Sequence, residues 1–238
     1  MRVESNKSAS NPTAEFIATR HNGKFIEILP DTFMIKGAIN DRGFEQGYAI
    51  KNRNNEYVLI DVIDAATRDA VKSMVKDGYD IKAILITGNT ASQDVYEDLA
   101  TLSKDAGDAQ IYVHPGNSNN DNFETKNLLE NDALMNSFNI TVEDLPAIRE
   151  GAAVIYCSAN NGMLFTGDSA KGSHYDSDLF TFTRDKLENN SQEFELVKYW
   201  QKFNRDFAYL FPRKGKPALE VDGVTRSNII NWISKANS

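Results

Sequence analysis

Apolar and polar residues alternate along the chain in two recurring patterns. Short apolar runs bounded by turn residues predict strands, whereas apolar residues spaced three or four apart predict amphipathic helices. We predict strands over residues 24–29, 32–36, 47–52, 56–61, 81–86, 110–113, 152–157 and 162–166. We predict helices over residues 65–77, 94–106, 193–210 and 227–236. Strands first, then strand–helix units, then a strand pair and helices predict a mixed sheet covered by helices.

Turn residues separate these elements. Pro30 and Asp31 lie between the first two strands, residues 53–55 predict a hairpin turn, and Gly78 is placed to end a helix. The run 81–86 is almost entirely apolar, which is typical of a strand buried on both faces. The Asn-rich segment 117–122 predicts a loop.

The length of 238 residues is enough for one large α/β domain. We find no internal repeat and no low-complexity linker, so we expect a flexible N-terminal tail over residues 1–15 and a single domain over residues 16–238. The polar opening has no apolar signal-peptide region, so it is either a tail or what remains after a leader has been removed. No run approaches the ~18 apolar residues that span a membrane.

Charge and cysteine content narrow the classes of partner. The formal net charge is −8, which disfavours nucleic acid or an acidic membrane as the main partner but leaves room for a local basic patch. Cys157 is the only cysteine, which excludes an internal disulfide and a multi-cysteine zinc site. A lone thiol fits a reducing compartment, so we expect a cytoplasmic location. Because Cys157 lies on a predicted buried strand, we predict that it packs as a small hydrophobic residue.

Four segments, in this order, resemble landmarks of the metallo-β-lactamase superfamily. They are Glu56-Tyr-Val-Leu-Ile-Asp61, Ile84-Leu-Ile-Thr87, Leu164-Phe-Thr-Gly-Asp168-Ser169 and Phe211-Pro-Arg-Lys-Gly215. The resemblance runs from about Phe25 to the end of the chain. It implies an α/β (α+β) fold, a four-layer αββα sandwich, with zinc-dependent hydrolysis of an ester, lactone or thioester as the activity of the family.

The metal ligands that the resemblance implies are replaced. The His-x-His-x-Asp-His positions fall on Gly88, Thr90, Ser92 and Gln93, the middle histidine falls near Arg149 and the last at Lys214, while Asp168 keeps the ligand type. The chain has three histidines, His21, His114 and His174, so no shift of register places two of them at i and i+2. A zinc site needs about four good donors, so we expect no zinc and no other cofactor.

The replacements suggest a refilled pocket. We expect Arg149 or Lys214 to pair with Asp168, because a buried carboxylate without a metal needs a cation. The residues that we expect around this pocket are Asp61, Gly88, Thr90, Ser92, Gln93, Arg149, Asp168, Lys214 and His174.

Three functions stay open. The first is a pseudoenzyme that binds a small anionic or acyl ligand or a protein partner, with no nucleic acid and no membrane. The second is a hydrolase of an ester, lactone or thioester without zinc, in which Asp168 or His114 holds the attacking water. The third is a scaffolding subunit of an oligomer, including a homo-oligomer, which would require a large apolar surface patch. Ser169 lacks the second glycine of a nucleophile elbow, since Lys171 stands there.

Overall fold

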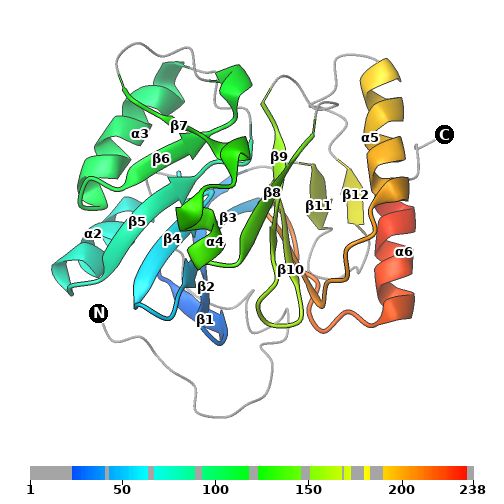
Figure 1. Cartoon of the computed structure of the whole chain (residues 1–238), viewed down its shortest axis with the longest axis horizontal. Helices are drawn as coiled ribbons and strands as arrows, with labels where there is room; N and C mark the ends of the chain where they lie inside the picture. The colour runs from blue at the N-terminus through cyan, green and yellow to red at the C-terminus, as the bar shows by residue number, and fades with distance from the viewer. Residues whose placement is uncertain are drawn as a thin grey trace.

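The computed structural model of the chain describes residues 23–40, 43–63, 67–88, 93–117, 123–145, 151–167, 169–172, 180–182 and 190–234. Two β-sheets lie face to face, and helices lie on both outer sides (Figure 1). The tail predicted over residues 1–15 lies outside the described residues.

The first sheet has seven strands in chain order. They are β1 (Ile26–Leu29), β2 (Thr32–Asn40), β3 (Gly43–Lys51), β4 (Glu56–Ile60), β5 (Asp80–Leu85), β6 (Gln110–Val113) and β7 (Lys126–Asn127). The strands β1 to β4 pair antiparallel, because short turns such as Pro30-Asp31 connect them. The strands β4 to β7 pair parallel, and helices make two of the connections.

The second sheet has four strands in the order β13-β10-β9-β8. They are β8 (Ile140–Asp144), β9 (Ala153–Cys157), β10 (Met163–Gly167) and β13 (Tyr209–Pro212). The hairpin predicted from residues 152–166 is confirmed as β9 and β10, whereas β13 runs parallel to β10. A separate pair of short strands, β11 (Ala170–Gly172) and β12 (Phe180–Phe182), follows β10.

Helices form the outer layers. The helices α2 (Arg68–Lys76) and α3 (Gln93–Asp105) lie outside the seven-stranded sheet, and α5 (Asn190–Lys202) and α6 (Gly223–Ile233) lie outside the four-stranded one (Figure 1). Three short helices, η2 (Pro115–Asn117), η3 (Leu128–Glu130) and α4 (Ala133–Ser137), lie between β6 and β8. This order of helix, sheet, sheet and helix confirms the predicted αββα sandwich.

Three hydrophobic clusters match these layers. The middle cluster lies between the sheets and joins residues such as Tyr48, Ile60 and Phe165, while a second packs α2 and α3 on the first sheet. The third packs α5 and α6 on the second sheet around Trp200. Apolar area removed from water at about 25 cal/mol per Å² is the main stabilising contribution. Cys157 is fully buried in the middle cluster, as predicted, and burial raises the pKa of its thiol to about 11.

The long helix predicted over residues 193–210 was wrong in its second half. The helix α5 ends at Lys202, and residues 209–212 form the strand β13. The reason lies in tertiary structure, because Tyr209, Leu210 and Phe211 pair with β10. This buried strand pairing outweighs the helical spacing of the apolar residues, which polar residues already interrupt in this segment.

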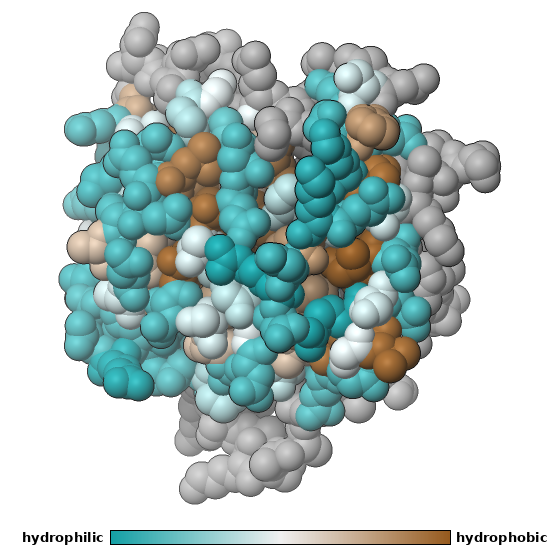
Figure 2. All heavy atoms as spheres, turned by 45° about the vertical axis from the view of Figure 1, so that its right-hand side comes forward, coloured by the Kyte–Doolittle hydropathy of each residue, from teal (hydrophilic) through white to brown (hydrophobic). Residues whose placement is uncertain are grey.

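The apolar side chains at the surface of the described residues are scattered. On the face that Figure 2 shows, apolar areas are separated by hydrophilic ones. Among the described residues, the large hydrophobic side chains that are well exposed are Phe194 and Val224. Within the same residues, no helix is long and apolar enough to cross a membrane.

The side chain of Asn131 forms hydrogen bonds with the outer edge of β8, the last strand of its sheet, and we expect these bonds to stabilise the fold. Its Oδ1 accepts from the Val142 N–H at 2.7 Å, and its Nδ2 donates to the Val142 carbonyl at 3.3 Å, as a neighbouring strand would. We expect Asn131→Ala to lower the free energy of unfolding by about 1–2 kcal/mol, because two backbone groups lose partners. Urea unfolding measures this, with exposed Asn139→Ala as the control, because Asn131 at φ 47° and Asn139 at φ 57° carry the same backbone cost for alanine; equal effects would contradict the interpretation.

Candidate functional site

The carboxyl ends of several strands meet at one end of the sandwich. Asp61 follows β4 and is buried, with a left-handed backbone at φ 53°. Its Oδ1 accepts from the Thr87 N–H at 2.8 Å and its Oδ2 accepts from the Thr87 hydroxyl at 2.6 Å. Thr87 follows β5, so the carboxylate of Asp61 ties the ends of two parallel strands together.

Thr87 also connects the two sheets. Its carbonyl accepts from the Ala153 N–H at the start of β9, at 2.9 Å. Gly167, at the end of β10, has φ 53°, and a Cβ placed on it would lie 2.0 Å from the Thr87 hydroxyl oxygen. The close approach explains why a glycine stands here. We call Asp61, Thr87 and Gly167 the strand-end cluster.

A charged segment follows β13 beside this cluster. The Arg213 N–H donates to the Gly167 carbonyl at 3.2 Å, so the segment is fixed to the end of β10. Glu45 accepts from Arg213 Nη2 at 2.7 Å and lies 3.7 Å from Lys214 Nζ. Lys216 lies two residues after Lys214, and Lys171 directly precedes Gly172, whose N–H donates to the Lys214 carbonyl at 3.0 Å; both lysines are half-buried. The arrangement brings cations together in a chain that is acidic overall.

A buried lysine lies on β2, the strand next to β3, which carries Glu45. Lys36 on β2 pairs in register with Gln46 on β3, and each is 1% exposed. The Gln46 amide donates to the carbonyls of Pro212 and Gly215, and the Gln46 N–H donates to the Arg213 carbonyl at 2.7 Å. Gln46 thereby connects Lys36 to the charged segment. Burial lowers the pKa of Lys36 from its ordinary value of 10.5, because the charged ammonium is poorly solvated there.

Stability should depend on pH through Lys36. Between the lowered pKa of the folded chain and 10.5, the unfolded chain binds more protons at this residue, so stability rises with pH. We expect the unfolding free energy of the wild type to rise relative to Lys36→Met as the pH rises toward 10.5. Chemical denaturation of both proteins across this range measures the difference. A difference that stays constant with pH, or that changes in the opposite direction, would contradict this.

His114 follows β6, and both of its ring nitrogens are engaged. Nδ1 accepts from the Gly116 N–H at 3.0 Å, so the proton of the neutral ring lies on Nε2, which donates to Asp144 Oδ1 at 3.0 Å. This pair links the ends of β6 and β8, which belong to different sheets. With both nitrogens of the neutral ring engaged in this way, no lone pair is left for a base or a metal ligand, and the role of His114 as a candidate base stays a prediction.

The structure describes part of the predicted pocket. Asp61 and Lys214 lie at the same end of the sandwich, Gly88 directly follows Thr87, and Gln93 begins α3. Thr90, Ser92, Arg149, Asp168 and His174 lie outside the described residues. The predicted ion pair of Asp168 with Arg149 or Lys214 therefore stays a prediction, while Lys214 is near Glu45.

Sequence reasoning missed Lys36, Glu45, Gln46 and Arg213. The sequence did contain a signal for Lys36. It lies two residues after Met34 on the same strand, so both side chains are on the face that is turned toward the second sheet. The sequence pattern predicts that this strand ends at residue 36, whereas in the structure it continues to Asn40.

The donor chemistry of the described residues does not fit a metal centre. Within those residues, no three His, Cys, Asp or Glu side chains gather where they could hold a metal ion. Both carboxylate oxygens of Asp61 are bound to Thr87.

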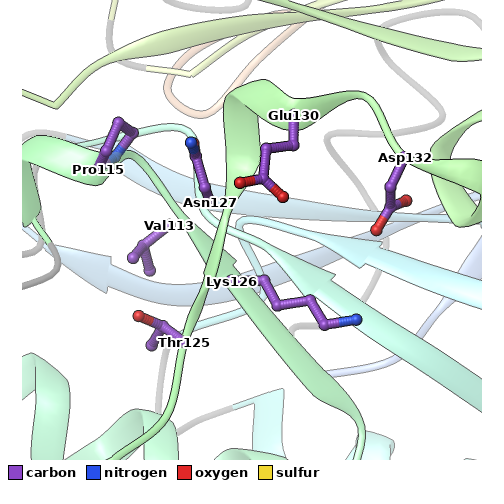
Figure 3. A pocket seen from close by; sticks show the side chains of 7 residues that line it. All are labelled: Val113, Pro115, Thr125, Lys126, Asn127, Glu130 and Asp132. Carbon is purple, nitrogen blue, oxygen red and sulfur yellow. The ribbon is translucent and has the colours of Figure 1, made fainter.

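A cavity of about 420 Å³ lies beside β7, and Asp61, Thr87 and Gly167 of the strand-end cluster do not line it. Figure 3 shows the carboxylates of Glu130 and Asp132 and the ammonium of Lys126 along its wall. Asp132 has a structural role there, because its carboxylate accepts hydrogen bonds from the Tyr112 hydroxyl at 2.8 Å and from two N–H groups of α4. Burial favours a higher pKa for Asp132, but these hydrogen bonds outweigh it and lower the pKa. We therefore interpret this wall as support for α4.

Comparison with known proteins settles the fold. No sequence family matches the chain, and no curated protein matches it in sequence. Among solved structures, the DIM-1 metallo-β-lactamase has a TM-score of 0.64 at 12% identity, covering 89% of this chain and 97% of that one. The chain has the metallo-β-lactamase fold.

Other proteins with this fold carry different chemistry. The metal-soaked flavodiiron core of Flv1 from Synechocystis sp. PCC6803 matches with a TM-score of 0.62 at 14% identity, over 90% of this chain and 61% of that one. The chemotaxis sensor ODP, solved as a peroxy diiron species, matches with 0.59 at 16% identity, over 91% and 95%. A β-lactamase and diiron proteins thus share one metallo-β-lactamase fold, so the fold by itself names no reaction.

Proposed function

We propose that the chain is a metallo-β-lactamase-fold protein that binds a small anionic or acyl ligand at the strand-end cluster and does not hydrolyse it through a di-metal centre. The observation that carries this proposal is that the segments around the cluster contain few metal-ligating residues and several cationic ones. Residues 87–93, which follow β5, contain no His, Cys, Asp or Glu, whereas Arg213, Lys214 and Lys216 follow β13.

The chemistry of these residues supports an anion. Neutral Thr, Ser and Gln side chains and Gly88 are poor zinc ligands. Arginine and lysine side chains suit carboxylate groups, and Arg213, Lys214 and Lys216 place three cations directly after β13. Glu45 offsets part of this charge and holds Arg213 in place, at 2.7 Å between Nη2 and Oε2. The zinc-free hydrolase has less support, because His114, one of its two candidate bases, is engaged through both nitrogens.

Metal analysis combined with a hydrolysis screen tests the proposal. The full chain is purified, incubated with zinc or iron(II), desalted and analysed by mass spectrometry for bound metal. Turnover of a β-lactam, a lactone and a thioester is measured in parallel. We expect well under one metal ion per chain and no hydrolysis above background. Titration with succinate, in the wild type and in Arg213→Gln, is expected to show saturable binding that the variant weakens roughly tenfold.

Two results would overturn the proposal. One is stoichiometric metal together with turnover. The other is metal-independent turnover that Asp168→Ala abolishes, which would favour the hydrolase.

A further inference from the structure

A cavity of about 630 Å³ opens at the other end of the sandwich. It lies among the turns that precede β2, β4, β8 and β10, and so at the amino ends of β4 and β10, whose carboxyl ends carry Asp61 and Gly167. Its volume is within the range of about 300–1,000 Å³ that is typical of small-molecule sites. The strand-end cluster takes no part in it.

Hydrogen bonds between the turns hold the walls together. Ser158 N–H donates to the Asn139 carbonyl at 3.0 Å, which joins the turns before β10 and β8. Asn160 Nδ2 donates to the Pro30 carbonyl at 3.1 Å, which joins the turns before β10 and β2. Asn52 Oδ1 accepts from the N–H groups of Asn54 and Glu56, at 2.9 and 3.1 Å, which shapes the turn that carries Arg53. The cavity is therefore preformed, and binding costs little ordering entropy.

The lining formed by the described residues is polar and carries one unbalanced positive charge. Lys51 Nζ lies 2.6 Å from Asp31 Oδ1, so these two charges offset each other. Within the part of the chain that the structure describes, the side chains of Arg53, Asn139 and Ser158 have no hydrogen-bond or ion-pair partner. They supply a guanidinium, an amide and a hydroxyl for a ligand. In a chain with a net charge of −8, a cavity with a surplus cation favours an anion.

We propose that this cavity is a second binding site, distinct from the strand-end cluster, for a small phosphorylated polyol such as a sugar phosphate. Arg53 pairs with the phosphate, because its planar fork matches two phosphate oxygens. Asn139 and Ser158 bind the hydroxyl groups of the polyol, because an amide and a hydroxyl can both donate and accept. A hydrophobic ligand is disfavoured, because few of the described side chains that line the cavity are apolar.

Isothermal titration with glucose 6-phosphate, glucose and inorganic phosphate tests the proposal on the full chain. The variants are Arg53→Gln, Asn139→Gly and Lys104→Gln. Asn139 has φ 57°, so glycine keeps its backbone conformation while removing the amide. Lys104 is exposed on α3, outside the cavity, and serves as the matched charge control.

We expect saturable binding of glucose 6-phosphate, weakened roughly tenfold or more by Arg53→Gln and severalfold by Asn139→Gly. Lys104→Gln should leave it unchanged, and glucose should bind far more weakly. Absence of saturable binding, or equal loss in Arg53→Gln and Lys104→Gln, would overturn the proposal. Binding that Arg213→Gln abolishes and Arg53→Gln spares would also overturn it, since the ligand would then lie at the strand-end cluster. These results do not depend on the metal analysis.

Discussion

Gly167→Ala is expected to lower the free energy of unfolding by at least about 3 kcal/mol. Two costs add up at this position. A left-handed backbone costs an ordinary residue roughly 1–2 kcal/mol relative to glycine. The new methyl group would also lie 2.0 Å from the Thr87 hydroxyl oxygen and 2.9 Å from the Thr87 Cβ, so β5 and β10 would have to move apart.

Gly78→Ala is the matched control for this variant. Gly78 has φ 83°, and a Cβ there meets no atom within 4 Å, so alanine has the backbone cost without the clash. Guanidinium unfolding of the wild type and both variants gives the two differences. Equal destabilisation by both substitutions would contradict a close contact between Gly167 and Thr87.

Asp61→Ala is expected to cost about 3 kcal/mol. The substitution removes two hydrogen bonds to a carboxylate, leaves the Thr87 N–H buried without its partner, and places alanine at φ 53°. The carboxylate ties β4 to β5, so the strand-end cluster should loosen with it. Hydrogen exchange at the Thr87 amide should therefore quicken more than exchange in the middle of β5.

Asp61→Asn separates these contributions. Asparagine tolerates a left-handed backbone, keeps one acceptor for the Thr87 N–H, and can donate to the Thr87 hydroxyl. We expect a smaller loss of about 1 kcal/mol, measured by the same denaturation. If asparagine costs as much as alanine, the charge of Asp61 matters more than its hydrogen-bond geometry.

Local sequence patterns predicted most of the elements. The all-apolar run that became β5 and the turn at Pro30-Asp31 were unambiguous, because burial and turn chemistry act over a few residues. The strand β13 was missed because its identity depends on pairing with β10, more than 40 residues earlier in the chain. The short strand β8 was also missed, although the alternation of apolar and polar residues over Ile140–Asp144 is itself a strand signal.

The candidate site was predicted less completely. Asp61 was predicted to lie in it, and its bonds to Thr87 give that residue a physical role. The ion pairs of Glu45 with Arg213 and Lys214 join residues about 170 positions apart, and no spacing rule reveals such a contact. His114 was expected near the pocket as a candidate base, but the sequence could not show that Gly116 and Asp144 occupy its nitrogens.

The order of strands in the two sheets has a consequence for fragments of this chain. Strands β1 to β7 form one sheet and β8 to β13 contribute to the others, so each large sheet comes from one continuous half of the sequence. The connection between the halves adds Leu128, Met135 and Phe138 to the cluster between the sheets. A fragment containing either half alone would present its inner face to water and self-associate. Mixed together, the two fragments would cover each other's inner faces and reassemble without a peptide bond between them.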